Sequence, residues 1–126
     1  MIHLDTSVLI EALTGPRRQA ARLRTLISQG ERIAFAALVL YEWLRGPRLR
    51  EELAAQEALF PRESAVTFGP AEAALAADWY RTVPRPRGRE LDLAIAACAV
   101  TAGATLWTLN PDDFDDIPKL SLLDST

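Results

Sequence analysis

The chain begins with the stretch MIHLDTSVLI, residues 1–10, in which an apolar segment runs directly into one acid and two hydroxyls. The apolar start predicts a short buried strand, and Val8, Leu9 and Ile10 resume the apolar pattern on a predicted helix. Asp5 therefore lies where a central strand turns into a helix. In an open α/β sheet this carboxyl edge is where ligands bind, although an acid at this position can also cap the helix.

Short apolar segments alternate with helical periodicity along the rest of the chain, and pairs such as Gly15-Pro16 and Gly69-Pro70 separate them. This alternation predicts an α/β fold with three layers (αβα), in which helices cover both faces of a central, mostly parallel sheet of four to five short strands. We expect a single domain over residues 1–126. Further strands are predicted at 33–35, 64–68, 104–107 and 120–123. Helices are predicted from Pro16 to Gly30 and over 38–44, 49–59, 70–80 and 91–102.

The composition is ordinary for a globular domain, with 49% hydrophobic and 25% charged residues. A net charge of −3 excludes a surface that attracts nucleic acid as a whole. All but one of the 14 cations are arginine, however, so a local basic patch is compatible with the acidic total. The lone cysteine, Cys98, lies among alanines and is expected to be a buried hydrophobe. Without a targeting or membrane-spanning segment, the sequence predicts a cytoplasmic protein.

Several acids occur at positions that the apolar pattern does not explain. They are Asp5 after the first strand, Glu42 within an apolar helix, Asp92 in the first turn of another helix, and Asp112 and Asp113 after the strand that ends near Trp107. Carboxylates about 4 Å apart repel by roughly 4 kcal/mol per pair at an effective dielectric constant near 20, so a converging group needs a shared cation. Oxygen ligands select Mg²⁺ or Mn²⁺. The only histidine, His3, has a strand position that favours packing over catalysis.

Each acid also has a purely structural interpretation. Glu42 can pair with Arg45, three residues further on. Asp92 can complement the N-terminus of its helix. The acids of 112–116 can form a solvated turn, and the prolines and glycine of 81–89 predict an exposed basic loop.

Four segments resemble the PIN-domain ribonucleases and, within that family, the VapC-type toxins of toxin–antitoxin pairs. The segments are LDTSVLI (4–10), YEWLRG (41–46), DLAIAACA (92–99) and AGATLWTLNPDDF (102–114), and together they extend over nearly the whole chain. The resemblance implies that Asp5, Glu42 and Asp92 are catalytic, metal-binding acids. It also implies that the metal is Mg²⁺ or Mn²⁺.

The fourth acidic position departs from the family pattern. Many members carry an acid where this sequence has Asn110, and others use an acid before a phenylalanine, which here is Asp113. We predict that Asp113 is the fourth catalytic and metal-binding acid, with Asn110 assisting through its carbonyl oxygen and with Thr6 and Thr108 orienting the acids. Asn110 and Asp112 are the alternatives, and the number of metals, one or two, stays open.

The activity implied by the resemblance is hydrolysis of an RNA phosphodiester bond by metal-activated water. Arg45, Arg85, Arg87 and Arg89 are then predicted to hold RNA phosphates against the acidic pocket, whereas the alternative for the loop is a solvated connection. The family also implies a homodimer and a cognate antitoxin partner.

Two other classes of function fit parts of the sequence. A housekeeping PIN nuclease of RNA maturation would use the same acids. A receiver-type signalling module would need an acidic pair after the first strand and a well-placed lysine, whereas Asp5 stands alone in its turn and Lys119 follows Pro118. A non-catalytic binding module is the expected function if the acids hold no metal.

Overall fold

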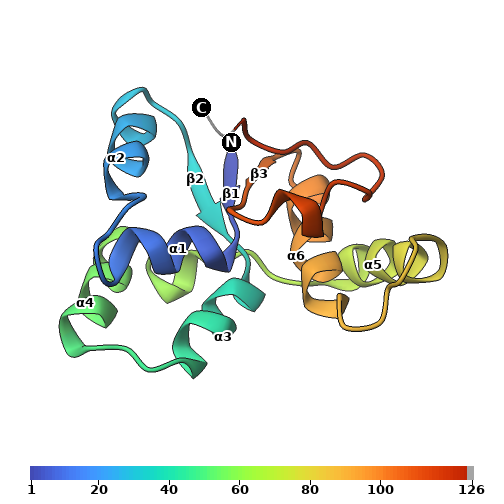
Figure 1. Ribbon diagram of the computed structural model, residues 1–126, viewed down its shortest axis with the longest axis horizontal. Helices are drawn as coiled ribbons and strands as arrows, with labels where there is room; N and C mark the ends of the chain where they lie inside the picture. Colours follow the sequence, from blue (N-terminus) through green and yellow to red (C-terminus); the bar gives the residue numbers. More distant parts are fainter. Residues whose placement is uncertain (125–126) are drawn as a thin grey trace.

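The sheet at the centre of the protein has three parallel strands. The computed structural model describes residues 1–124. Strand β1 (Ile2–Leu4) lies between β2 (Ile33–Phe35) and β3 (Thr105–Trp107), in the order β2-β1-β3 (Figure 1). Leu4 lies opposite both Phe35 and Trp107, so all three strands end at the same edge of the sheet.

The prediction of four to five strands is wrong, because two predicted strands pair only at a single bridge. They are 64–68, in which Val66 bridges Ala36, and 120–123, in which Leu122 bridges Leu106. Ser64 belongs to a short 3₁₀ turn, and a helix begins at Pro70, which leaves few extended residues between them. The β-branched content of 64–68 did not decide its structure, since strand propensity depends on having partners to pack against.

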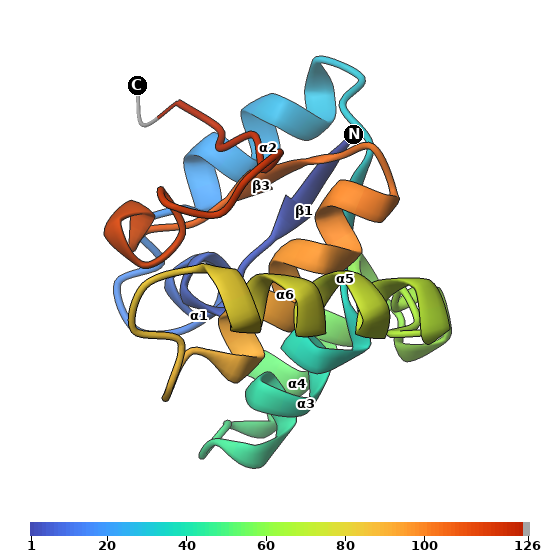
Figure 2. The ribbon, with the colours of Figure 1, turned by 90° about the vertical axis from the view of Figure 1, so that its right-hand side faces the viewer.

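Helices flank the sheet on both sides, as predicted. In Figure 1, α1, α2 and α4 lie on one side of the strands and α5 and α6 on the other, and Figure 2 views the molecule from the side of α5. None of the helices that the structure describes is long and apolar enough to cross a membrane. The helices are α1 (Thr6–Leu13), α2 (Ala20–Ser28), α3 (Ala37–Arg45), α4 (Arg50–Leu59), α5 (Pro70–Thr82) and α6 (Glu90–Thr101), with 3₁₀ turns at Arg62–Ser64 and Pro111–Asp113.

The start of α2 differs from the prediction. It begins at Ala20 and not at Pro16, because Gly15 and Arg17 have φ angles of 56° and 53°. This left-handed conformation cannot continue into a right-handed helix. The turn that results places Gln19 and the first turns of α2 near the residues that follow β3, where they line a common pocket.

Helix α6 is the most deeply buried helix. Residues 93–99 are all buried, and the helix contacts α5, α3 and β3. Cys98 lies within this run, as predicted, and burial raises the pKa of its thiol to about 11. His3 on β1 is only 1% exposed, which agrees with the predicted packing role. Because α6 is enclosed along most of its length, the acid in its first turn, Asp92, is held at a fixed place beside the sheet.

Candidate active site

Asp5 is fixed at the carboxyl end of β1. Its backbone N–H donates to the carbonyl of Trp107 on β3 (2.9 Å), and the residue is 5% exposed. The carboxylate does not cap α1, so the structural alternative for this acid is wrong. Its Oδ2 instead accepts hydrogen bonds from Ser7 Oγ (2.9 Å) and Thr108 Oγ1 (2.7 Å). Two donors on one oxygen fix the orientation of the carboxylate.

The two hydroxyls that hold Asp5 are themselves held by the backbone that follows β3. Thr108 Oγ1 accepts the N–H of Asn110 (3.0 Å), and Ser7 Oγ accepts the N–H of Leu109 (3.1 Å). Thr108 thus contacts the acid that it was predicted to orient, whereas Asn110 takes part through its backbone N–H and has an exposed side chain. No role was predicted for Ser7. Its place two residues after Asp5 is the signal for such a contact, since serine commonly bonds to groups nearby in the sequence.

Glu42 projects from α3 between two partners. Its Oε1 accepts a hydrogen bond from Thr6 Oγ1 (2.6 Å), and its Oε2 lies 3.5 Å from Arg45 Nη2. The Arg45 side chain is 52% exposed and covers the Tyr41 ring, so the ion pair is a weak surface contact. The predicted Glu42–Arg45 alternative therefore occurs, but the shorter bond joins Glu42 to the residue that follows Asp5.

Asp92 lies within electrostatic range of the other three predicted acids. Burial and the negative charges of Asp5, Asp113 and Glu42 raise the pKa of its carboxyl to about 6, and the positive charge of Arg89 opposes this rise. The first turn of a helix favours an ionised acid, yet here burial and repulsion dominate. The end of β1, α3, α6 and the Pro111–Asp113 turn thus bring four acids into one electrostatic field.

The donor chemistry of this group fits a hard divalent cation. All four side chains offer carboxylate oxygens, which Mg²⁺ and Mn²⁺ prefer, and a cation among them would offset their repulsion. Within residues 1–124, no group of three or more His, Cys, Asp or Glu side chains stands close enough together to hold a metal ion. Metal binding would therefore require the carboxylates to turn toward a common point, and the four ligand roles stay predictions.

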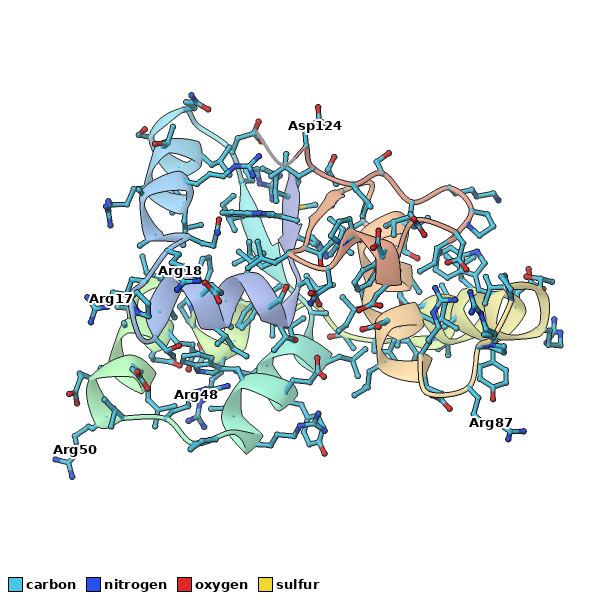
Figure 3. The ribbon with its side chains drawn as sticks, viewed as in Figure 1. Arg17, Arg18, Arg48, Arg50, Arg87 and Asp124 are labelled. Carbon is cyan, nitrogen blue, oxygen red and sulfur yellow. The ribbon has the colours of Figure 1, made fainter. Side chains whose placement is uncertain are left out.

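The basic loop is shorter than predicted, 83–89, because α5 continues to Thr82. Arg85 and Arg87 are exposed, and Figure 3 shows Arg87 extending away from the protein. Arg89 differs from them, because its guanidinium donates to Asp116 in a bidentate pair (2.6 and 3.0 Å). It also donates to the backbone carbonyls of Pro84 (3.1 Å) and Asp113 (2.9 Å).

This site on a parallel sheet can now be compared with known proteins. The PIN domain family matches residues 2–120 of this chain. The chain belongs to the PIN domain family. Its sequence is 36% identical over 122 residues to ribonuclease VapC19 of Mycobacterium tuberculosis, a match that covers 93% of this chain and 94% of that protein.

Solved structures share the fold of this PIN domain. DNA-bound VapBC from Salmonella typhimurium has a TM-score of 0.74 at 22% identity, covering 98% of this chain and 96% of that chain. FitAcB from Neisseria gonorrhoeae has a TM-score of 0.71 at 21% identity, covering 98% and 97%. VapBC2 from Rickettsia felis, bound to a promoter DNA fragment, has a TM-score of 0.68 at 21% identity, covering 100% of both chains. The family resemblance of the four sequence segments is therefore confirmed.

Proposed function

We propose that this PIN domain is a metal-dependent endoribonuclease that acts as the toxin of a toxin–antitoxin pair. The observation that carries the proposal is the group of acids at the carboxyl edge of the sheet. The negative charges of Asp5, Glu42 and Asp113 together raise the pKa of the Asp92 carboxyl. The similarity to ribonuclease VapC19 over most of both chains supports RNA as the substrate.

Asp5, Glu42, Asp92 and Asp113 would hold Mg²⁺ or Mn²⁺. A bound divalent cation supplies positive charge against the phosphate oxygens and lowers the pKa of water that attacks the phosphorus. Hydrogen bonds within the chain already orient two of these acids. Ser7 and Thr108 orient the Asp5 carboxylate, and Thr6 fixes one oxygen of Glu42.

Among residues 1–124, the hydroxyls that contact the acids are engaged in hydrogen bonds to them, which supports water as the attacking group. Cys98 is buried in α6, and burial raises the pKa of its thiol to about 11. Ser7 and Thr108 already donate their hydroxyl protons to Asp5. Their oxygens in turn accept backbone N–H groups, so both hydroxyls serve to position the acid.

Exposed arginines would bring RNA to this acidic edge. Arg85 and Arg87 belong to the loop before α6 and are exposed, and Arg45 lies beside Glu42. Phosphate binding by such residues is electrostatic and independent of sequence. We assign this role to these three, because the four hydrogen bonds of Arg89 are made within the protein.

The proposed partners are a cognate antitoxin and a second copy of the chain, in the cytoplasm. The solved structures of similar fold include VapBC assemblies, which supports the first partner. Exposed hydrophobic side chains on and beside α3 support a protein interface: Tyr41 is 56% exposed, Leu44 36% and Leu49 60%.

Cleavage of a labelled single-stranded RNA of random sequence tests the activity. We expect the purified protein to cut it with Mg²⁺ or Mn²⁺ and to stop when EDTA is added. Asp5→Asn should abolish cleavage without unfolding the protein, whereas Asp78→Asn, which changes an exposed acid on α5, should leave it intact. Full activity of Asp5→Asn, or no cleavage by the wild type with either metal, would overturn the proposal.

A further inference from the structure

A pocket of about 490 Å³ lies next to the acids, between the start of α2, the residues that follow β3 and the end of the described chain. Its lining combines the polar residues Gln19, Arg22, Thr108 and Asp124 with Trp107 and several leucine and proline residues. Thr108 belongs to the pocket and also donates to Asp5. The Thr108 side chain therefore joins the lining of the pocket to the Asp5 carboxylate.

The guanidinium of Arg22 forms one wall of this pocket. Its Cζ lies over the Trp107 ring, 5.1 Å from the centroid. Trp107 itself is 1% exposed, so the arginine and not the indole is the planar surface offered to a ligand. Arg22 also donates to the backbone carbonyl of Asp124, which joins α2 to the C-terminal segment across the pocket. Figure 3 shows Asp124 at the top of the view, above the strands, and Arg87 at the opposite, lower right end.

These features match the chemistry of a nucleobase. A supported guanidinium plane is a surface on which unstacked RNA bases stack, and the pocket's volume lies in the range of small-ligand sites. The apolar side chains suit the faces of a base. Gln19 and Asp124, which are among the lining residues, carry amide and carboxylate groups able to hydrogen-bond with the edge of a base. A phosphate fits less well, because Asp124 adds a negative charge beside the existing acids.

We propose that this pocket binds one base of the RNA, close to the bond that is cut, and so sets the sequence preference of cleavage. The inference rests on the proposed ribonuclease activity. Arg22 would stack on the base, and Gln19 and Asp124 would distinguish one base edge from another. The exposed arginines of the loop 83–89 would hold phosphates without regard to sequence, so preference and general affinity would come from different parts of the molecule.

Mapping of cleavage ends on a random RNA pool tests this assignment. We expect the wild type to prefer certain bases at one position near the cut. Arg22→Lys, which keeps the charge and removes the plane, and Leu123→Trp, which fills the pocket, should lose that preference and raise KM about 5- to 100-fold. Arg24→Lys, an exposed change on the same helix, is the matched control. An unchanged preference in Arg22→Lys and Leu123→Trp, or no preference in the wild type, would overturn the proposal.

A second measurement does not depend on cleavage. AMP, CMP, GMP and UMP are titrated into the ¹⁵N-labelled protein, with ribose 5-phosphate as the control for phosphate binding. Shifts of the Trp107 Nε1–H and Arg22 Nε–H signals with nucleotides, absent with ribose 5-phosphate and lost in Leu123→Trp, support a base site. Equal shifts with ribose 5-phosphate, or none with any nucleotide, contradict it. A wild type that shows these shifts but cuts no RNA would refute the proposed function and leave the base site standing.

Discussion

Arg89 and Asp116 form a bidentate ion pair, with nitrogen–oxygen distances of 2.6 and 3.0 Å, across 27 residues of sequence. The same guanidinium donates to the carbonyl of Asp113 (2.9 Å), and Arg89 directly precedes α6, which carries Asp92. The pair therefore fixes the turn that presents Asp113 against the helix that presents Asp92. Arg89 acts on the position of the acids, and both of its terminal nitrogens, Nη1 and Nη2, donate within the protein.

Arg89→Lys and Asp116→Asn should therefore have the same effect. Neither variant can form the bidentate pair, and a displacement of one acid should lower kcat about 10- to 100-fold with little change in KM. The free energy of unfolding should fall by about 1 kcal/mol, because the pair is only partly exposed. Steady-state kinetics on labelled RNA and urea denaturation check both values.

The matched control for this pair is Asp115→Asn, which changes an exposed acid in the same turn. It should leave kcat and stability unchanged. A rise in KM for Arg89→Lys at constant kcat, with no effect of Asp116→Asn, would show instead that Arg89 contacts RNA.

Substitution of Arg87 should change KM and not kcat, the reverse of the effect expected for Arg89. Because its side chain extends away from the protein (Figure 3), Arg87→Ala should raise KM and leave kcat and stability unchanged. The slope of log affinity against log salt concentration should become shallower by about 0.7, the value for one phosphate contact on a single strand. Binding to a labelled RNA is measured at several salt concentrations. Arg62→Ala, a surface arginine paired with Glu57, is the control, and an unchanged slope in Arg87→Ala would argue against the contact.

The sequence predicted the elements that depend on local pattern and missed the contacts that depend on tertiary structure. The alternation of apolar segments predicted β2 and β3 because their residues are buried or half-buried between helices. Segment 64–68 has the same local character, but only Val66 finds a partner. The sequence placed Asp5 after the first strand and Asp92 in the first turn of a helix, and the structure has both acids at these positions. The Arg89–Asp116 pair could not be predicted, since no local pattern relates two residues so far apart.

The hydroxyls that hold Asp5 should contribute to metal binding and to activity by orienting its carboxylate. Thr108→Val removes a 2.7 Å donor to Oδ2, and Ser7→Ala removes a second at 2.9 Å. Groups that orient metal-binding side chains typically contribute 10- to 100-fold in metal affinity or activity, and we expect losses of about that size. Calorimetric titration with Mn²⁺ and RNA cleavage measure them. Thr101→Val, at the exposed end of α6, should change neither, and wild-type Mn²⁺ affinity in both site variants would contradict the role.

Asp92 should make the stability of the metal-free protein depend on pH. Its pKa is about 6 in the folded state, against 3.8 without the surrounding burial and charge. The folded protein therefore binds this proton more tightly than the unfolded chain, and the resulting stabilisation is present at low pH and lost as the pH rises through about 6. The difference of about two pKa units corresponds to at most about 3 kcal/mol.

Asp92→Asn isolates this contribution, because the amide does not titrate. In EDTA the variant should be more stable than the wild type above pH 6, and the advantage should shrink toward pH 4 as the wild-type carboxyl is protonated. Burial lowers the pKa of His3 from 6.5, which destabilises the folded state as the pH falls below that value. This effect is common to both proteins and cancels in the difference. Urea denaturation from pH 4 to pH 8 measures the free energy of unfolding of both proteins. A difference between Asp92→Asn and the wild type that does not vary with pH would show that Asp92 is not held among repelling charges.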